Sequence, residues 1–87
     1  RAGPDGGSAQ ALEDLAAFRA IPGMTVISPA DSTEMALATH AVLDFAGPVY
    51  MRTGRSPARA VYGDGHVFTI GKGHILRDGG DVTLIAC

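Results

Sequence analysis

Met24-Thr-Val-Ile-Ser-Pro-Ala-Asp31 is the stretch that decides how this chain of 87 residues folds. It contains a short apolar, β-branched run at residues 24–28, which follows the breaker pair Pro22-Gly23 and stops at a further proline. Such a run between turn residues is typical of a buried strand. Asp31 then stands where a helix N-cap is expected, with Glu34 three residues later as its reciprocal partner. The stretch therefore predicts a core strand that leads directly into a capped helix.

A first helix is expected before this strand, over residues 10–20. Ser8 is its candidate N-cap, and acidic residues in or near the first turn agree with the direction of the helix dipole. Leu12, Leu15 and Ala16 recur at helical spacing, so they are expected to face the sheet.

The capped helix is expected to run over residues 32–45, and a second strand over residues 48–52 follows the break at Gly47. Strands joined through a helix pair in parallel, so this order indicates a parallel α/β layer. The helix presents an apolar stripe at the right spacing, made of Met35, Ala38, Thr39, Val42 and Leu43.

The rest of the chain, residues 53–87, differs in character. Residues 53–59 are rich in Gly, Pro and Arg, which indicates a loop or linker. Short apolar runs at residues 67–70 and 74–77 indicate two strands, and residues 81–87 resemble a central strand. Parallel strands are normally buried on both faces, and nothing follows this one to cover it. We therefore expect the chain to be a fragment of a larger protein.

Composition excludes several classes of function. The formal charge of −2 argues against a partner such as nucleic acid or an anionic membrane, whose binders are basic. No apolar run approaches the roughly 18 residues that span a bilayer, and no basic segment precedes a hydrophobic one, so no secretory signal is visible. The single cysteine, Cys87, fits a reducing compartment. A cytoplasmic location is expected.

Three features that suggest a cofactor site are better explained otherwise. Gly63-Asp-Gly65 resembles the opening of the magnesium and diphosphate site of thiamine enzymes, but the asparagine needed some 25–30 residues later is missing, so a turn is expected. Residues 65–73 exceed P-loop spacing by one residue and lack its Ser or Thr. The histidines at 40, 66 and 74 lack ligand-like spacing. We expect no metal site built from this chain alone.

Arg52, Arg55 and Arg59 form the one concentration of positive charge, at and just beyond the end of the second strand. The carboxyl ends of strands are where α/β sheets place their ligands, and a guanidinium can hold a phosphate or carboxylate. The alternative is a solvated linker with one structural ion pair. Asp5, in a glycine-rich loop, is either a turn-forming residue or an acceptor for a substrate hydroxyl.

Six motifs follow one another along the chain: Gly3-Pro-Asp-Gly-Gly-Ser-Ala-Gln10, Glu13-Asp-Leu-Ala16, Arg19-Ala-Ile-Pro-Gly-Met-Thr-Val26, Pro29-Ala-Asp31, Gly47-Pro-Val-Tyr-Met-Arg52 and Ile70-Gly-Lys-Gly73. With these motifs the chain resembles the transketolase family, most closely the separate C-terminal subunit of its split bacterial type. The resemblance implies transfer of a two-carbon ketol unit between sugar phosphates in carbohydrate metabolism, dependent on thiamine diphosphate and Mg2+, as in the pentose phosphate pathway.

The resemblance also implies a domain organisation. Residues 1–55 would be the C-terminal part of a parallel-sheet pyrimidine-binding domain of the thiamine-diphosphate-binding fold. Residues 56–66 would be a linker, and residues 67–87 the first strands of a C-terminal α/β domain. The ligands of the cofactor and metal would lie mostly outside this chain, in an N-terminal, diphosphate-binding subunit or domain of a homo- or hetero-oligomer. The isolated fragment is expected to be inactive.

Two substrate-binding residues are implied, and no catalytic residue lies in this segment. Asp5 matches a family aspartate that hydrogen-bonds a substrate hydroxyl, and Arg52 matches the arginine that binds the substrate phosphate. Ala9 stands where the family usually has histidine, which removes a donor and proton-transfer partner. Two alternatives therefore stay open: a thiamine enzyme for another ketose or a 2-oxo acid, or a catalytically silent subunit for assembly or regulation.

Overall fold

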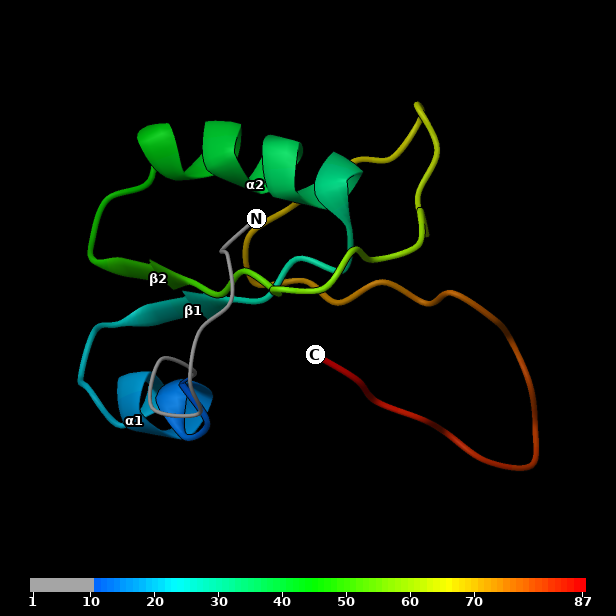
Figure 1. The fold of residues 1–87 in the computed structure, drawn as a ribbon, viewed down its shortest axis with the longest axis horizontal. Helices are drawn as coiled ribbons and strands as arrows, with labels where there is room; N and C mark the ends of the chain where they lie inside the picture. Colours follow the sequence, from blue (N-terminus) through cyan, green and yellow to red (C-terminus); the bar gives the residue numbers. More distant parts are fainter. Residues whose placement is uncertain (1–10) are drawn as a thin grey trace.

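The structure, a computed structural model, describes residues 11–87. Its elements are α1 (Asp14–Arg19), β1 (Thr25–Ile27), α2 (Ser32–Leu43) and β2 (Val49–Met51). The strands pair in parallel, with Thr25 opposite Val49 and Ile27 opposite Met51. Figure 1 shows α1 and α2 on opposite faces of this small sheet. The predicted parallel α/β layer is therefore confirmed for this part of the chain.

The start of α2 follows the sequence prediction closely. Oδ1 of Asp31 accepts a hydrogen bond of 2.9 Å from the backbone N–H of Glu34. The carboxylate of Glu34 reaches back and accepts one of 2.7 Å from the N–H of Ala30. The reciprocal pair is confirmed, although Glu34 caps the residue before the N-cap rather than the N-cap itself. The helix ends at Leu43, two residues before the predicted end.

The prediction for α1 was wrong in its length and in its buried face. The helix starts at Asp14 rather than at residue 10, and its N-cap residue makes no side-chain capping bond. Leu12 precedes the helix and is 76% exposed, and Ala16 is exposed, whereas Asp14 is buried. The reason is tertiary, because Asp14 has a hydrogen-bond partner on β2. The candidate cap Ser8 lies outside the described residues.

The apolar stripe of α2 is confirmed only in part. Ala38 is fully buried, with an exposed fraction of 0%, and Met35 and Val42 are half-buried around it. Thr39 and Leu43, which were expected on the same stripe, are exposed. The covered face of α2 is thus narrower than the sequence pattern, since a sheet of two short strands offers little surface to cover.

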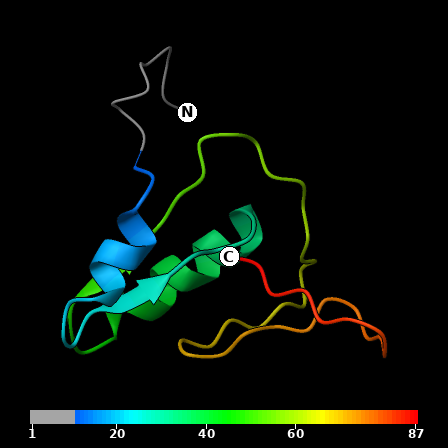
Figure 2. The ribbon, with the colours of Figure 1, turned by 90° about the horizontal axis from the view of Figure 1, so that it is seen from below.

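The three strands predicted after residue 66 are not formed. Residues 67–70, 74–77 and 81–87 are irregular, and Figure 2 shows this segment extending out to one side before its C-terminal end turns back. Within residues 11–87 no other strand pairs with them, and a strand needs such a partner for its N–H and C=O groups. Phe68 and Ile70 are partly buried, whereas the other large apolar side chains of these runs are exposed: Val67, Ile75, Leu76, Val82, Leu84 and Ile85.

The turns between these segments agree with the sequence. The N–H of His66 donates to the carbonyl of Gly63 over 3.0 Å, so the triplet that starts at Gly63 is a turn, as expected. Residues 53–59 are irregular, as a loop or linker should be. None of the helices in residues 11–87 is long and apolar enough to cross a bilayer.

Asp31 also joins α2 to the chain that follows β2. Its Oδ2 accepts hydrogen bonds from the backbone N–H groups of Val61, over 2.7 Å, and Tyr62, over 2.9 Å. Together with the bond from Glu34, these donors hold the pKa of Asp31 below its usual range, and burial opposes them only in part. One carboxylate therefore fixes both a helix start and a segment thirty residues downstream.

Replacing Asp31 with asparagine is expected to lower the melting temperature by several degrees, and alanine should lower it further, because alanine leaves three N–H groups without their acceptor. Since the folded pKa is depressed, the ionised carboxylate stabilises the protein above its unfolded pKa. This stability is lost as the pH falls below about 4. Thermal unfolding at about pH 7 and pH 3 should show a smaller acid loss for D31N than for the wild type. The exposed D78N serves as a control, and an equal acid loss in D31N and the wild type would contradict the assignment.

Candidate anion site

Arg52 lies at the carboxyl edge of the sheet. It directly follows β2, and its N–H donates to the carbonyl of Ile27 at the end of β1 over 2.9 Å. This bond holds the backbone of Arg52 against the neighbouring strand at the edge where α/β folds bind their ligands. Its side chain keeps 38% exposure, so the guanidinium is accessible from solvent.

A buried carboxylate lies beside this guanidinium. Oδ2 of Asp14 is 3.6 Å from Nε of Arg52, which is an ion pair rather than a hydrogen bond. The same oxygen accepts a hydrogen bond of 2.8 Å from the hydroxyl of Tyr50. Tyr50 stacks on Phe18, with ring centroids 3.8 Å apart and planes at 9°. We call Asp14, Phe18, Tyr50 and Arg52 the Asp14 cluster.

The electrostatics of the Asp14 cluster keep its carboxylate ionised. The hydrogen bond from Tyr50 lowers the pKa of Asp14, with a smaller contribution from the Arg52 charge, although burial opposes both. The same bond raises the pKa of Tyr50, because ionised tyrosine could not donate it. Oδ1 of Asp14 is buried and has no hydrogen-bond partner within residues 11–87. Within residues 11–87 the cluster therefore holds a charged carboxylate whose side-chain hydrogen bond falls on Oδ2 alone.

Of the two substrate-binding residues expected from the sequence, the structure describes Arg52. Asp5 lies outside the described residues, as does Ala9, so whether Asp5 shares a pocket with Arg52 stays a prediction. Arg55 and Arg59 are exposed in the irregular segment after β2.

Sequence reasoning missed Asp14, which was interpreted only as a residue of the first helical turn. A signal existed on the other partner, because Tyr50 and Arg52 alternate along β2 and therefore share one face of the sheet. A tyrosine hydroxyl and a guanidinium on the same covered face need acceptors, and a carboxylate can serve both. The first helix, which carries Glu13 and Asp14, was the element that could provide one.

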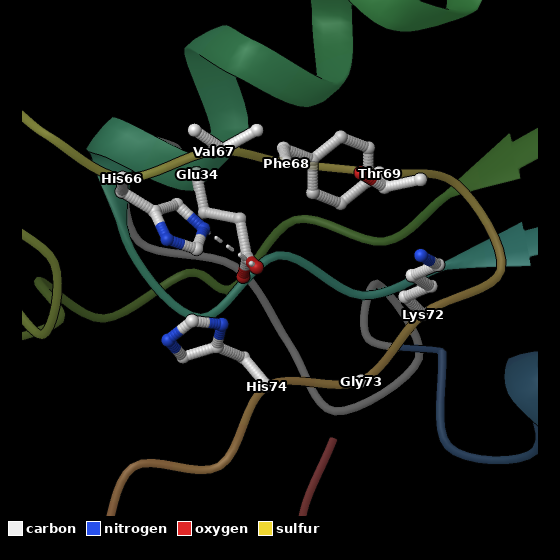
Figure 3. A pocket seen from close by; sticks show the side chains of 8 residues that line it. All are labelled: Glu34, His66, Val67, Phe68, Thr69, Lys72, Gly73 and His74. Atoms are coloured by element: carbon white, nitrogen blue, oxygen red, sulfur yellow. Dashed lines mark ion pairs between the residues drawn. The ribbon is translucent and has the colours of Figure 1, made fainter.

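A second group of polar residues surrounds a cavity of about 100 Å3 at the start of α2 (Figure 3). Nε2 of the buried His66 lies 3.4 Å from Oε1 of Glu34, the residue that also caps α2. His66 stacks on Tyr62 at 3.7 Å, and His74 meets both rings edge-on. Burial and the charge of Glu34 raise the pKa of Tyr62. The group attaches the segment after β2 to the helix.

Neither group of residues fits a magnesium and diphosphate site. In residues 11–87 no set of three or more His, Cys, Asp or Glu side chains is arranged to hold a metal ion. The triplet starting at Gly63 forms a turn, and its Asp64 is exposed. The substrate-binding role expected of Arg52 stays a prediction.

In the comparison with known proteins, the family model and the relatives point to the same family. The family model described as "Transketolase, pyrimidine binding domain" matches residues 1–60. A 6-deoxy-6-sulfo-D-fructose transketolase subunit from Clostridium sp. (strain MSTE9) is 44% identical over 94% of this chain and 26% of its own length. A putative transketolase C-terminal section from Methanocaldococcus jannaschii is 43% identical over 97% of this chain and 27% of its own length.

A third relative is an apulose-4-phosphate transketolase subunit of Phocaeicola vulgatus, which is 37% identical over 93% of this chain and 26% of its own length. The chain thus spans about a quarter of the length of each of these three relatives. No solved structure matches it.

Proposed function

This chain belongs to the transketolase family, and from that membership we propose that its parent protein transfers a two-carbon ketol unit from ketoses that carry an anionic tail. Arg52 binds the tail. The observation that carries this proposal is the position of Arg52, an exposed guanidinium held at the carboxyl edge of the sheet beside a buried carboxylate.

The names of two relatives support an anionic tail. One acts on a sulfonated fructose and the other on a phosphorylated apulose. Sulfonate and phosphate both present tetrahedral oxyanions, which the planar fork of an arginine can bind through two parallel N–H groups. The proposed substrate class is therefore a ketose with a phosphate or sulfonate at the end remote from the reacting carbons.

Thiamine diphosphate, with Mg2+, would supply the carbanion-stabilising chemistry in the assembled enzyme. Its ligands would come from an N-terminal, diphosphate-binding partner, a proposal supported by relatives named as subunits or C-terminal sections. Residues 1–55 would then be the C-terminal part of a pyrimidine-binding domain, and residues 67–87 the start of a further domain. Residues 56–66 would be the linker between the two domains. On this proposal residues 1–87 alone are inactive, and Asp5 binds a substrate hydroxyl.

The experiment compares three donors that share one carbon skeleton: D-fructose 6-phosphate, 6-deoxy-6-sulfo-D-fructose and D-fructose. The full-length protein is assembled with its partner and cofactor, and ketol transfer is measured for each. At least one tailed ketose should have a kcat/KM about 100-fold above that of D-fructose, since losing a charge-assisted bidentate contact costs about 2.7 kcal/mol. The preferred tail identifies the substrate class.

Ala9, in the place of the family histidine, keeps two alternatives open. Equal kcat/KM values for the three ketoses would contradict the proposal. Turnover only with a 2-oxo acid donor would favour the first alternative, a thiamine enzyme that acts on another substrate. No turnover with any donor would favour the second, a catalytically silent subunit.

A further inference from the structure

We propose that Asp14 is a positioning residue for Arg52, which it holds so that the terminal amino groups of the guanidinium face the anionic tail. This rests on the proposed function of Arg52. The juxtaposition that suggests it is a buried carboxylate on α1 set 3.6 Å from Nε of the arginine that directly follows β2.

The geometry of the guanidinium decides which of its edges is available. A guanidinium binds oxyanions through a side edge, which includes Nε, or through an end edge formed by its two terminal amino groups. In this structure the Nε side is turned to Asp14. The end edge of Arg52 is therefore the one left for a ligand.

Asp14 is itself firmly held. It is only 7% exposed, and Tyr50 donates to it from the middle of β2. Tyr50 is fixed in turn by its stack on Phe18, one helical turn after Asp14 on α1. The carboxylate, the phenol and the guanidinium therefore belong to one contact network between α1 and β2. A guanidinium held in this way loses less freedom when it binds an anion than a free one does.

A purely structural role does not account for the second oxygen of Asp14. Burying a carboxylate is unfavourable unless its oxygens are hydrogen-bonded, yet Oδ1 has no such partner within residues 11–87. Buried carboxylates with shifted pKa values and a specific charge partner cluster at functional sites. A functional site can keep one carboxylate oxygen without a hydrogen bond, because it needs the full negative charge beside Arg52.

The test uses the assembled full-length enzyme and the variants D14N, R52A and D14N/R52A. Asparagine keeps the size of Asp14 and an acceptor for Tyr50 but removes the charge. D14N is expected to raise KM for D-fructose 6-phosphate about 10-fold with kcat within about twofold of the wild type, because only tail binding is impaired. In the R52A background the same change should have no further effect. E13Q, at the exposed neighbouring residue, is the matched control.

The outcomes separate the two proposals. If R52A does not change the preference for D-fructose 6-phosphate over D-fructose, the function proposed for Arg52 fails. If R52A does change that preference, but D14N leaves the KM for D-fructose 6-phosphate unchanged or lowers it, only the positioning role of Asp14 is overturned. A third result is that D14N raises KM equally in the wild-type and R52A backgrounds, or raises KM for D-fructose as well. Either result assigns Asp14 a structural role and overturns the positioning role.

Discussion

Replacing Arg52 with alanine is expected to raise KM for a ketose phosphate about 100-fold and to leave the KM of the tail-free ketose within about twofold of its wild-type value. Each charge-assisted hydrogen bond contributes about 1.5–3 kcal/mol, and about 2.7 kcal/mol corresponds to a 100-fold change. A contact made equally in the ground state and the transition state affects KM rather than kcat. Steady-state kinetics of the assembled enzyme with D-fructose 6-phosphate and D-fructose measure both values.

Two further variants sharpen this prediction. Lysine at position 52 keeps the charge but not the planar fork, so R52K should fall between R52A and the wild type. Arg59 is exposed in the segment after β2, and R59A is the matched loss of one positive charge. An R59A enzyme as impaired as R52A would mean that the general positive field, rather than one guanidinium, attracts the substrate.

The second large effect is expected in the core. Ala38 has no exposed surface, so a leucine at this position must displace its neighbours, and overpacking typically costs about 1–3 kcal/mol. The control lies two residues away on the same helix, because Ala36 is exposed and A36L should change stability by less than about 0.5 kcal/mol. Urea unfolding of the two variants compares them. Equal destabilisation by A38L and A36L would show that Ala38 is not at a packed contact.

Local patterns predicted the elements whose cause is local. A β-branched run between breakers indicated the strand that became β1, and the Asp31 and Glu34 pair indicated the start of α2, because capping acts over three or four residues. The parallel pairing of β1 and β2 followed from the helix between them. Each of these predictions depends on contacts between residues or elements that are close along the chain.

The errors concern contacts between distant residues. The start of α1 and its buried face depend on Asp14 and Tyr50, which are 36 positions apart and carry no common pattern. The three apolar runs after residue 66 have the composition of strands, but composition does not provide a neighbouring strand. For the same reason, Arg52 could be proposed directly from its place after a strand, whereas Asp14 could be proposed only indirectly, through the acceptors that Tyr50 and Arg52 need.

The two hydrogen bonds that Asp31 accepts from the N–H groups of Val61 and Tyr62 limit where the chain can bend. The backbone up to Tyr62 is anchored on the first turn of α2, so it moves with the sheet as one body. Tyr62, His66 and His74 are in contact with one another, and His66 pairs with Glu34 on α2. Any swing of the downstream part relative to the sheet must therefore pivot about bonds beyond His74. The stretch between β2 and Tyr62 contains glycine and proline, but both of its ends are fixed to the sheet and the helix. It therefore does not act as a hinge.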